Sequence, residues 1–169
     1  MNKEIKNKIV QKLAKNILEE NIKYKNIYQD EECYLIGNGI SLKWFDLNKF
    51  SNKRSLICTW MYLHNQLKYL KVVGDVGIHP FLFSPFLTNP WSKKFGINKI
   101  GKYMIESGRL VDRNYPVFTS ISNYPVLKNY NNISYLYRFN TPNDIKKINM
   151  SGIFSFMSGS VEALLGVAI

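Results

Sequence analysis

The chain has 169 residues, of which 46% are hydrophobic and 14% aromatic. This composition favours one globular domain with a sizeable core and excludes an intrinsically disordered chain. No stretch approaches the ~20 consecutive apolar residues of a membrane-spanning helix, and the first residues lack the apolar core of a signal peptide. We therefore expect a cytoplasmic protein.

The formal net charge is +11, and the basic residues are spread along the chain. They form no Arg-rich stripe, zinc-finger spacing or aromatic ribonucleoprotein signature, so we expect no nucleic-acid partner. The charge can instead attract a phosphate-bearing small molecule or an anionic lipid surface, which leaves a peripheral contact with the inner membrane open. A coding bias toward Asn, Lys and Ile would produce the same charge without any partner.

Cys33 and Cys58 lie in apolar runs and are predicted to be reduced, buried thiols. Together with His64 and His79 they do not provide the ligand spacing of a zinc site. We expect no metal.

The first predicted element is an amphipathic helix over residues 3 to 24, because Ile5, Ile9, Leu13 and Ile17 recur at helical spacing. We expect residues 1 to 24 to form an N-terminal helix that packs on the flank of the domain. Its frequent lysines leave contact with a partner or a membrane surface open.

Apolar runs predict five strands, at residues 33 to 36, 55 to 59, 70 to 74, 117 to 121 and 135 to 139. Helical segments are predicted at residues 41 to 50, 98 to 107 and 158 to 169, and a helix or an irregular crossover is predicted at residues 60 to 70. The alternation predicts an α/β, Rossmann-like three-layer domain with a mainly parallel sheet over residues 25 to 169. The chain stops in an apolar helix, which indicates a fragment or a truncated reading frame.

The clearest sign of a ligand is Gly37-Asn38-Gly39, which follows the first apolar run directly. We expect the glycines to give φ freedom and close backbone approach, the N–H groups to hold an anionic phosphate, and Ser41 to cap the next helix. Leu42 occupies the place of the third glycine of the dinucleotide fingerprint, so NAD is not expected. A tight turn without a ligand is the alternative.

Other candidates are predicted to lie along the same edge of the sheet, where open α/β domains bind ligands. Asp75 is expected to end the third strand, Thr59 ends the second, and Ser158, Gly159 and Ser160 begin the last helix. Turn or cap roles are the alternatives for each. No acid in sequence orients His64 or His79, so we expect structural roles for both and name no catalytic residue.

The run Cys33-Tyr-Leu-Ile-Gly-Asn-Gly-Ile-Ser-Leu-Lys43, followed by Asp46-Leu47, resembles the N-terminal signature of bacterial lipooligosaccharide sialyltransferases. It is also similar to a related family that contains motility accessory factors and a pterin pyrophosphokinase. The resemblance implies a domain that binds a CMP-sugar donor without a metal or cofactor, for transfer to a glycan acceptor of surface polysaccharide or lipooligosaccharide. It implies a nucleotide site made of Gly37, Asn38, Gly39, Ser41, Thr59, Asp75, Ser158, Gly159 and Ser160.

The chain also departs from the family pattern. Ile40 replaces the usual proline, Thr59 and Asp75 replace asparagines, and the family's catalytic histidine and tyrosines lie beyond the point where this chain ends. We therefore expect the donor-binding part of such an enzyme. The alternatives are a pterin or other diphosphate-transfer enzyme of the same fold, or a non-catalytic or truncated interaction protein; the donor sugar, acceptor and oligomeric state are not predicted.

Overall fold

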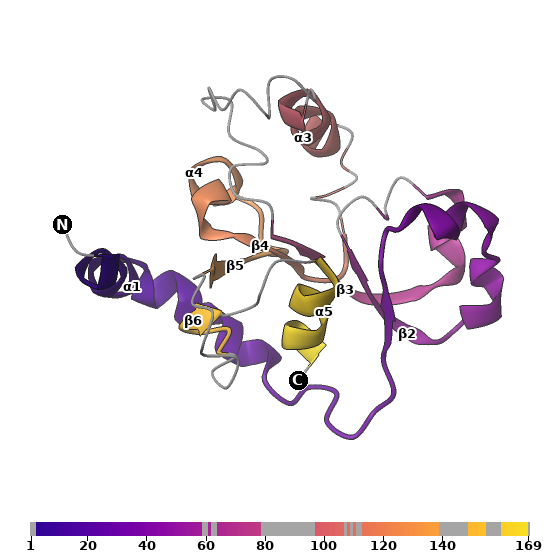
Figure 1. Ribbon diagram of the computed structural model, residues 1–169, viewed down its shortest axis with the longest axis horizontal. Helices are drawn as coiled ribbons and strands as arrows, with labels where there is room; N and C mark the ends of the chain where they lie inside the picture. The colour runs from indigo at the N-terminus through magenta and orange to yellow at the C-terminus, as the bar shows by residue number, and fades with distance from the viewer. Residues whose placement is uncertain are drawn as a thin grey trace.

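The structure is a computed structural model that describes residues 3–58, 61, 64–78, 97–106, 108, 110, 113–138, 149–154 and 160–168. Its centre is a six-stranded sheet in the order β1-β2-β3-β4-β5-β6 (Figure 1). Every pairing between neighbouring strands is parallel. The strands are β1 (Tyr34–Ile36), β2 (Arg54–Cys58), β3 (Lys71–Gly77), β4 (Val117–Ser120), β5 (Ile133–Arg138) and β6 (Ile153–Phe154). The predicted α/β architecture with a parallel sheet is confirmed.

The helices differ in length along the chain. The α-helices are α1 (Lys3–Glu19), α3 (Ile97–Glu106), α4 (Tyr124–Leu127) and α5 (Ser160–Ala168). Short 3-10 helices connect several strands: η1 (Glu20–Tyr24), η2 (Ile40–Trp44), η3 (Leu47–Phe50), η5 (Asn65–Tyr69) and η6 (Ile121–Asn123). Within the described ranges, none of the helices has both the length and the apolar character needed to cross a bilayer.

The predicted helix at residues 41 to 50 is in fact the pair η2 and η3. Asp46 separates them because its backbone is extended, at φ −81° and ψ 103°, and its side chain accepts a hydrogen bond from Asn48 N at 3.0 Å. A short aspartate that satisfies a nearby backbone N–H starts a new helix rather than continuing the old one.

The sheet has a helix-covered core on each face, which gives the three predicted layers. On one face, Ala163 and Leu164 of α5 pack with Leu56, Val76 and Phe118 of the sheet. The connections between successive strands pack on the other face, where they bury Leu47, Met61, Met104 and Leu127. Side chains alternate between the two faces along each strand, so both cores are built from the same strands.

The N-terminal helix packs on the flank of the sheet, as predicted. Asn21, only 2% exposed, donates hydrogen bonds from Nδ2 to Tyr135 O and to Met150 O, both at 2.7 Å. The buried stripe of α1 runs through Ala14 and Leu18. The predicted apolar face is broader than this contact, since part of it, namely Ile5, Ile9 and Leu13, is exposed at 50%, 45% and 79%.

Candidate functional site

The Gly37-Asn38-Gly39 turn lies at the carboxyl end of β1, against the first turn of α5. A methyl group built on Gly37 would lie 3.5 Å from Cγ2 of Val161. From this turn the chain enters η2 on one face of the sheet, while α5 covers β1, β2 and β3 on the other. Open parallel sheets bind ligands outside the carboxyl ends of their strands, and the turn lies at that edge.

The conformation of the turn differs from the expectation. Gly39 is extended, at φ −65° and ψ 155°, and Gly108 is the only glycine with positive φ in the part of the chain that the structure describes. The turn therefore requires no conformation that is reserved for glycine. A methyl at Gly37 would make an ordinary contact with Val161 Cγ2 at 3.5 Å, and a methyl at Gly39 would meet only Ser41 Oγ, at 3.7 Å.

Ser41 is not the helix cap that the sequence predicts. Gly39 occupies the N-cap position of η2, and no side chain accepts a hydrogen bond there. Ser41 lies one residue inside η2 and is exposed. It remains close to the turn through its contact with Gly39.

A cavity of about 560 Å³ opens beside this turn, and we call it the carboxyl-edge cavity. Its volume lies within the range of small-molecule sites. Two predicted residues, Asn38 and Gly39, line it together with residues that the sequence did not single out for the site: Ile40, Leu42, Lys43, Phe45, Met61, Asn65 and Gln66. His64, predicted to be structural, completes the lining.

His64 and Gln66 fix the wall of the cavity. His64 Nδ1 accepts from Gln66 N at 3.2 Å and caps η5, while Gln66 Oε1 accepts from Leu47 N at 2.8 Å. With Nδ1 as an acceptor, the neutral imidazole carries its proton on Nε2. His64 therefore has the predicted structural role, and in this tautomer it would donate a hydrogen bond to a ligand rather than act as a base.

Lys43 supplies positive charge at the cavity. It is exposed, and its Nζ lies 5.8 Å from the centroid of the Trp44 ring. Sequence reasoning did not select Lys43, since a lone lysine in a basic chain carries no signal. Lys43 belongs to η2 and is among the residues that line the cavity.

Cys58 ends β2 beneath the same turn. Burial, and to a smaller extent the nearby Asp75, raise the pKa of its thiol to about 11, against the lowering effect of a hydrogen bond from the Asn38 backbone. The thiol is consequently protonated at neutral pH and is a poor nucleophile. Cys33 and Cys58 are both free thiols, as expected, although Cys33 is only half-buried.

Asp75 is not at the end of its strand, because β3 continues to Gly77. It pairs in register with Ile57 and Val117 and is 1% exposed, and it lines neither of the two described cavities. Burial raises the pKa of its carboxyl to about 8, against the lowering effects of Arg113 and a hydrogen bond from the Val76 backbone. Its Oδ1 accepts no hydrogen bond.

A neutral Asp75 would not repel a phosphate bound at the edge of the sheet. The carboxyl is protonated below a pKa of about 8, so it carries little charge at neutral pH. It also lies inside β3 rather than at the carboxyl edge. Asp75 therefore belongs to the buried sheet and not to the lining of the site.

A buried polar contact that the sequence did not predict joins the carboxyl ends of β3 and β4. Thr119 Oγ1 donates to Gly77 O at 2.8 Å and accepts from Asn123 Nδ2 at 3.0 Å. Both side chains are completely buried. An alternating pattern could have placed Thr119 on a buried face, but its partners are set by strand order, which local sequence does not encode.

Several predicted residues cannot be compared with the structure. Thr59, Ser158, Gly159 and His79 lie outside the described residues. Ser160 begins α5, and its side chain is likewise outside the description. Glu162, in the first turn of α5, complements the positive end of the helix dipole.

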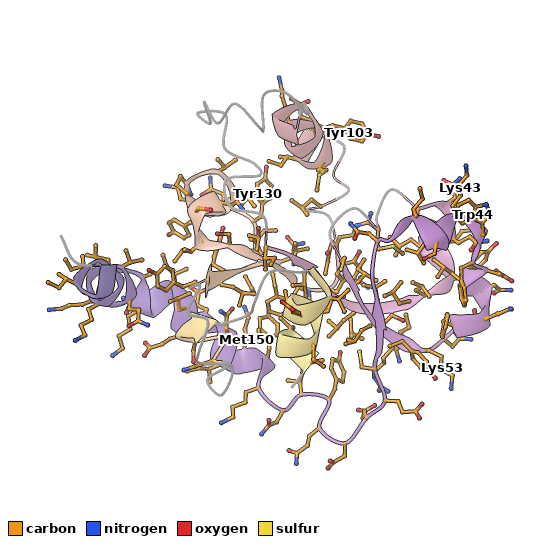
Figure 2. The ribbon with its side chains drawn as sticks, in the orientation of Figure 1. Lys43, Trp44, Lys53, Tyr103, Tyr130 and Met150 are labelled. Carbon is orange, nitrogen blue, oxygen red and sulfur yellow. The ribbon has the colours of Figure 1, made fainter. Side chains whose placement is uncertain are left out.

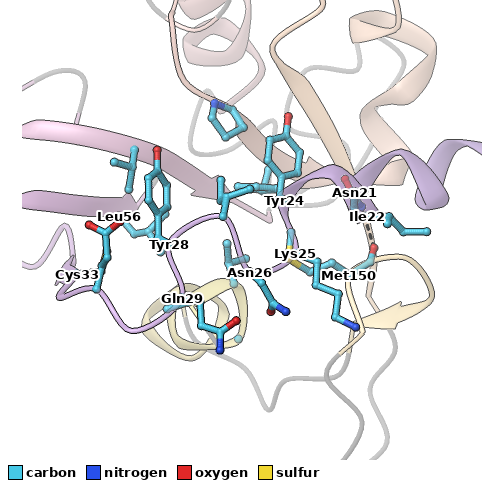
Figure 3. A pocket seen from close by; sticks show the side chains of 18 of the residues that line it. Asn21, Ile22, Tyr24, Lys25, Asn26, Tyr28, Gln29, Cys33, Leu56 and Met150 are labelled. Atoms are coloured by element: carbon cyan, nitrogen blue, oxygen red, sulfur yellow. Dashed lines mark hydrogen bonds between the residues drawn. The ribbon is translucent and has the colours of Figure 1, made fainter.

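A second cavity, of about 870 Å³, lies at the opposite edge of the sheet (Figure 3). Its lining includes Asn21, Tyr24, Cys33, Pro116 and Gly166, which lie near the starts of β1 and β4 and the last turn of α5. The amino ends of parallel strands are not the edge at which such sheets bind ligands. None of the predicted site residues lines this cavity.

Comparison of the chain with models of known protein families, with curated proteins and with solved structures finds no match. The resemblance to the sialyltransferases therefore stays a prediction. The fold and the carboxyl-edge cavity are the observations from which a function can be argued.

Proposed function

We propose that this domain binds a nucleotide sugar in the carboxyl-edge cavity and serves as the donor-binding part of a metal-independent, sialyltransferase-like glycosyltransferase. The observation that carries the proposal is the cavity of small-molecule size beside the carboxyl end of β1, which Asn38 and Gly39 of the turn line. In parallel α/β sheets, this edge is where nucleotides bind.

The cavity lining suits the parts of such a donor. The ammonium group of Lys43 would pair with the phosphate, and the Nε2–H of His64 would donate to a phosphate or sugar oxygen. Leu42, Phe45 and Met61 add apolar surface for the base. The CMP-sugar type of donor comes from the sequence resemblance alone.

The first test is calorimetry with cytidine monophosphate on the wild type and on Gly39→Val. A Cβ at Gly39 would meet only Ser41 Oγ, in ordinary contact at 3.7 Å, and the backbone there is extended, so the variant should fold normally. Its methyl groups would occupy the approach of the ligand to the backbone, and we expect binding to be lost. Unchanged binding to Gly39→Val would remove the turn from the site.

Lys43→Gln tests the charge in the same titration. Loss of a charge-assisted hydrogen bond costs about 1.5–3 kcal/mol, which corresponds to a tenfold to hundredfold weaker affinity. Lys128→Gln, which removes an exposed lysine after α4, is the matched control and should bind as the wild type does.

The nucleotide class is tested by thermal stabilisation with CMP, CDP, UDP, GDP and ATP. A ligand at tenfold its dissociation constant stabilises by only about 1.4 kcal/mol, so high concentrations are required. Preference for cytidine nucleotides supports the proposal. Stabilisation by ATP with magnesium, but not by CMP, would favour a diphosphate-transfer enzyme instead.

A further inference from the structure

At the end of the molecule next to β1, several large apolar side chains are exposed to solvent. We call this region, formed by η2, η3, η5 and their links at residues 40–53 and 64–71, the basic aromatic lobe. Ile40 and Trp44 are 82% and 75% exposed, and Phe45 and Tyr69 are 43% and 37% exposed. Apolar groups gathered on one surface of a protein commonly mark an interaction site.

The same lobe is strongly basic. It contains five exposed lysines, Lys43, Lys49, Lys53, Lys68 and Lys71, against a single acidic residue, Asp46. In Figure 2, Lys43 and Trp44 project side by side from η2, and Lys53 projects from the same end of the molecule. A surface that combines apolar side chains with positive charge is complementary to an anionic, partly apolar surface.

Three of the lysines lie over aromatic rings of the lobe. The Nζ atoms of Lys43, Lys49 and Lys68 lie 5.8, 5.9 and 5.2 Å from the ring centroids of Trp44, Phe45 and Tyr69. Each ammonium group is thus held next to an apolar ring. Tryptophan and tyrosine favour the headgroup level of a bilayer, where lysines meet lipid phosphates.

We propose that the basic aromatic lobe docks on an anionic membrane surface, with Trp44 and Ile40 in the headgroup region and the lysines other than Lys43 on lipid phosphates. This inference goes beyond nucleotide binding and does not depend on it. Ile40, Lys43 and Phe45 also line the carboxyl-edge cavity, so docking would bring the mouth of that cavity to the lipid headgroups.

The details of the lobe favour lipid over nucleic acid or protein. Bases stack on open aromatic faces, but here lysines lie over Trp44 and Phe45, and Phe45 stacks on Phe50 at 5.6 Å between centroids. The most exposed large apolar residue that the structure describes, Ile40, has no ring at all. Protein interfaces are depleted in lysine, whereas every basic residue of this lobe is a lysine.

The test is co-sedimentation of the full chain with vesicles of phosphatidylcholine alone and of an equimolar mixture with phosphatidylglycerol. Trp44, Lys49 and Lys53 do not line the cavity, so their variants remove no side chain of the proposed nucleotide site. We expect Trp44→Ser to weaken binding to the mixed vesicles on the order of tenfold. The double variant Lys49→Gln/Lys53→Gln should weaken it by about 25-fold, from roughly fivefold for each lysine.

Two control variants locate the contact. Leu13→Ser removes the most exposed apolar side chain of α1, which lies at the opposite end of the molecule (Figure 1), and Lys128→Gln removes an exposed lysine outside the lobe. Both should bind vesicles as the wild type does. Added salt should weaken vesicle binding by the wild type and by every variant.

Four results would overturn the proposal. These are equal binding to vesicles with and without phosphatidylglycerol, wild-type binding by the lobe variants, loss of binding by Leu13→Ser, and retention on single-stranded RNA without any vesicle binding. The third result would assign the contact to α1 instead. Binding of cytidine nucleotides is measured separately and fails or succeeds independently of all four.

Discussion

Replacement of Asp75 by Asn should make the stability of this protein less dependent on pH. In the folded state burial raises the pKa of Asp75 from 3.8 to about 8. The native carboxyl therefore keeps a proton that the unfolded chain has released between these two pKa values. Its contribution to stability is fully present below pH 3.8 and is lost as the pH rises toward about 8.

The magnitude follows from the width of this window. Each pH unit inside it lowers the free energy of unfolding of the wild type by about 1.4 kcal/mol relative to a variant that cannot ionise at this position. Between about pH 5 and about pH 7 the difference between wild type and Asp75→Asn should therefore change by roughly 3 kcal/mol in favour of the variant. The cost of placing an amide at position 75 does not depend on pH, so it cancels when the two pH values are compared.

Urea unfolding at the two pH values measures the change directly. Ser55→Ala, which removes a buried hydroxyl that does not titrate, is the control and should show a difference from wild type that is independent of pH. If Asp75→Asn also differs from the wild type by the same amount at both pH values, the reasoning is refuted. The carboxylate would then be ionised in the folded protein and stabilised by Arg113.

Three further substitutions test the packing of the domain. Gly37→Val should destabilise by about 1 kcal/mol in urea unfolding, because its γ methyls would extend beyond a Cβ that already contacts Val161 Cγ2 at 3.5 Å. Gly74→Ala should cost a similar amount, about 1–2 kcal/mol, since its Cβ would lie 2.8 Å from Cδ2 of Leu56. Asn21→Leu should cost about 2–3 kcal/mol by removing one buried hydrogen bond, to Tyr135 O, and one part-buried hydrogen bond, to Met150 O. An unfolding midpoint equal to that of the wild type would contradict the prediction for that variant.

The architecture could be predicted because apolar runs mark buried strands wherever they occur. The runs at residues 33 to 36 and 117 to 121 both contain strands of the sheet. The helices between the early strands could not be placed in the same way, because Asp46 ends one short helix and begins another. The spacing of apolar residues contains no information about the hydrogen bond between Asn48 N and the Asp46 side chain.

The site was predicted in part. The Gly37-Asn38-Gly39 turn was selected on its glycines, and Asn38 and Gly39 line the carboxyl-edge cavity. Asp75 was taken for the end of a strand because a charged residue seldom lies inside a buried one. The burial of its carboxyl between Ile57 and Val117 depends on strand pairing, which no local pattern reveals.

The most direct measurement of nucleotide binding at the carboxyl edge is amide chemical-shift mapping of the isotope-labelled protein during titration with cytidine monophosphate. We expect the largest changes at Gly37, Asn38 and Gly39, with none at Asn26 in the other cavity. Changes confined to the other cavity, or no change at a saturating concentration, would contradict the proposed site.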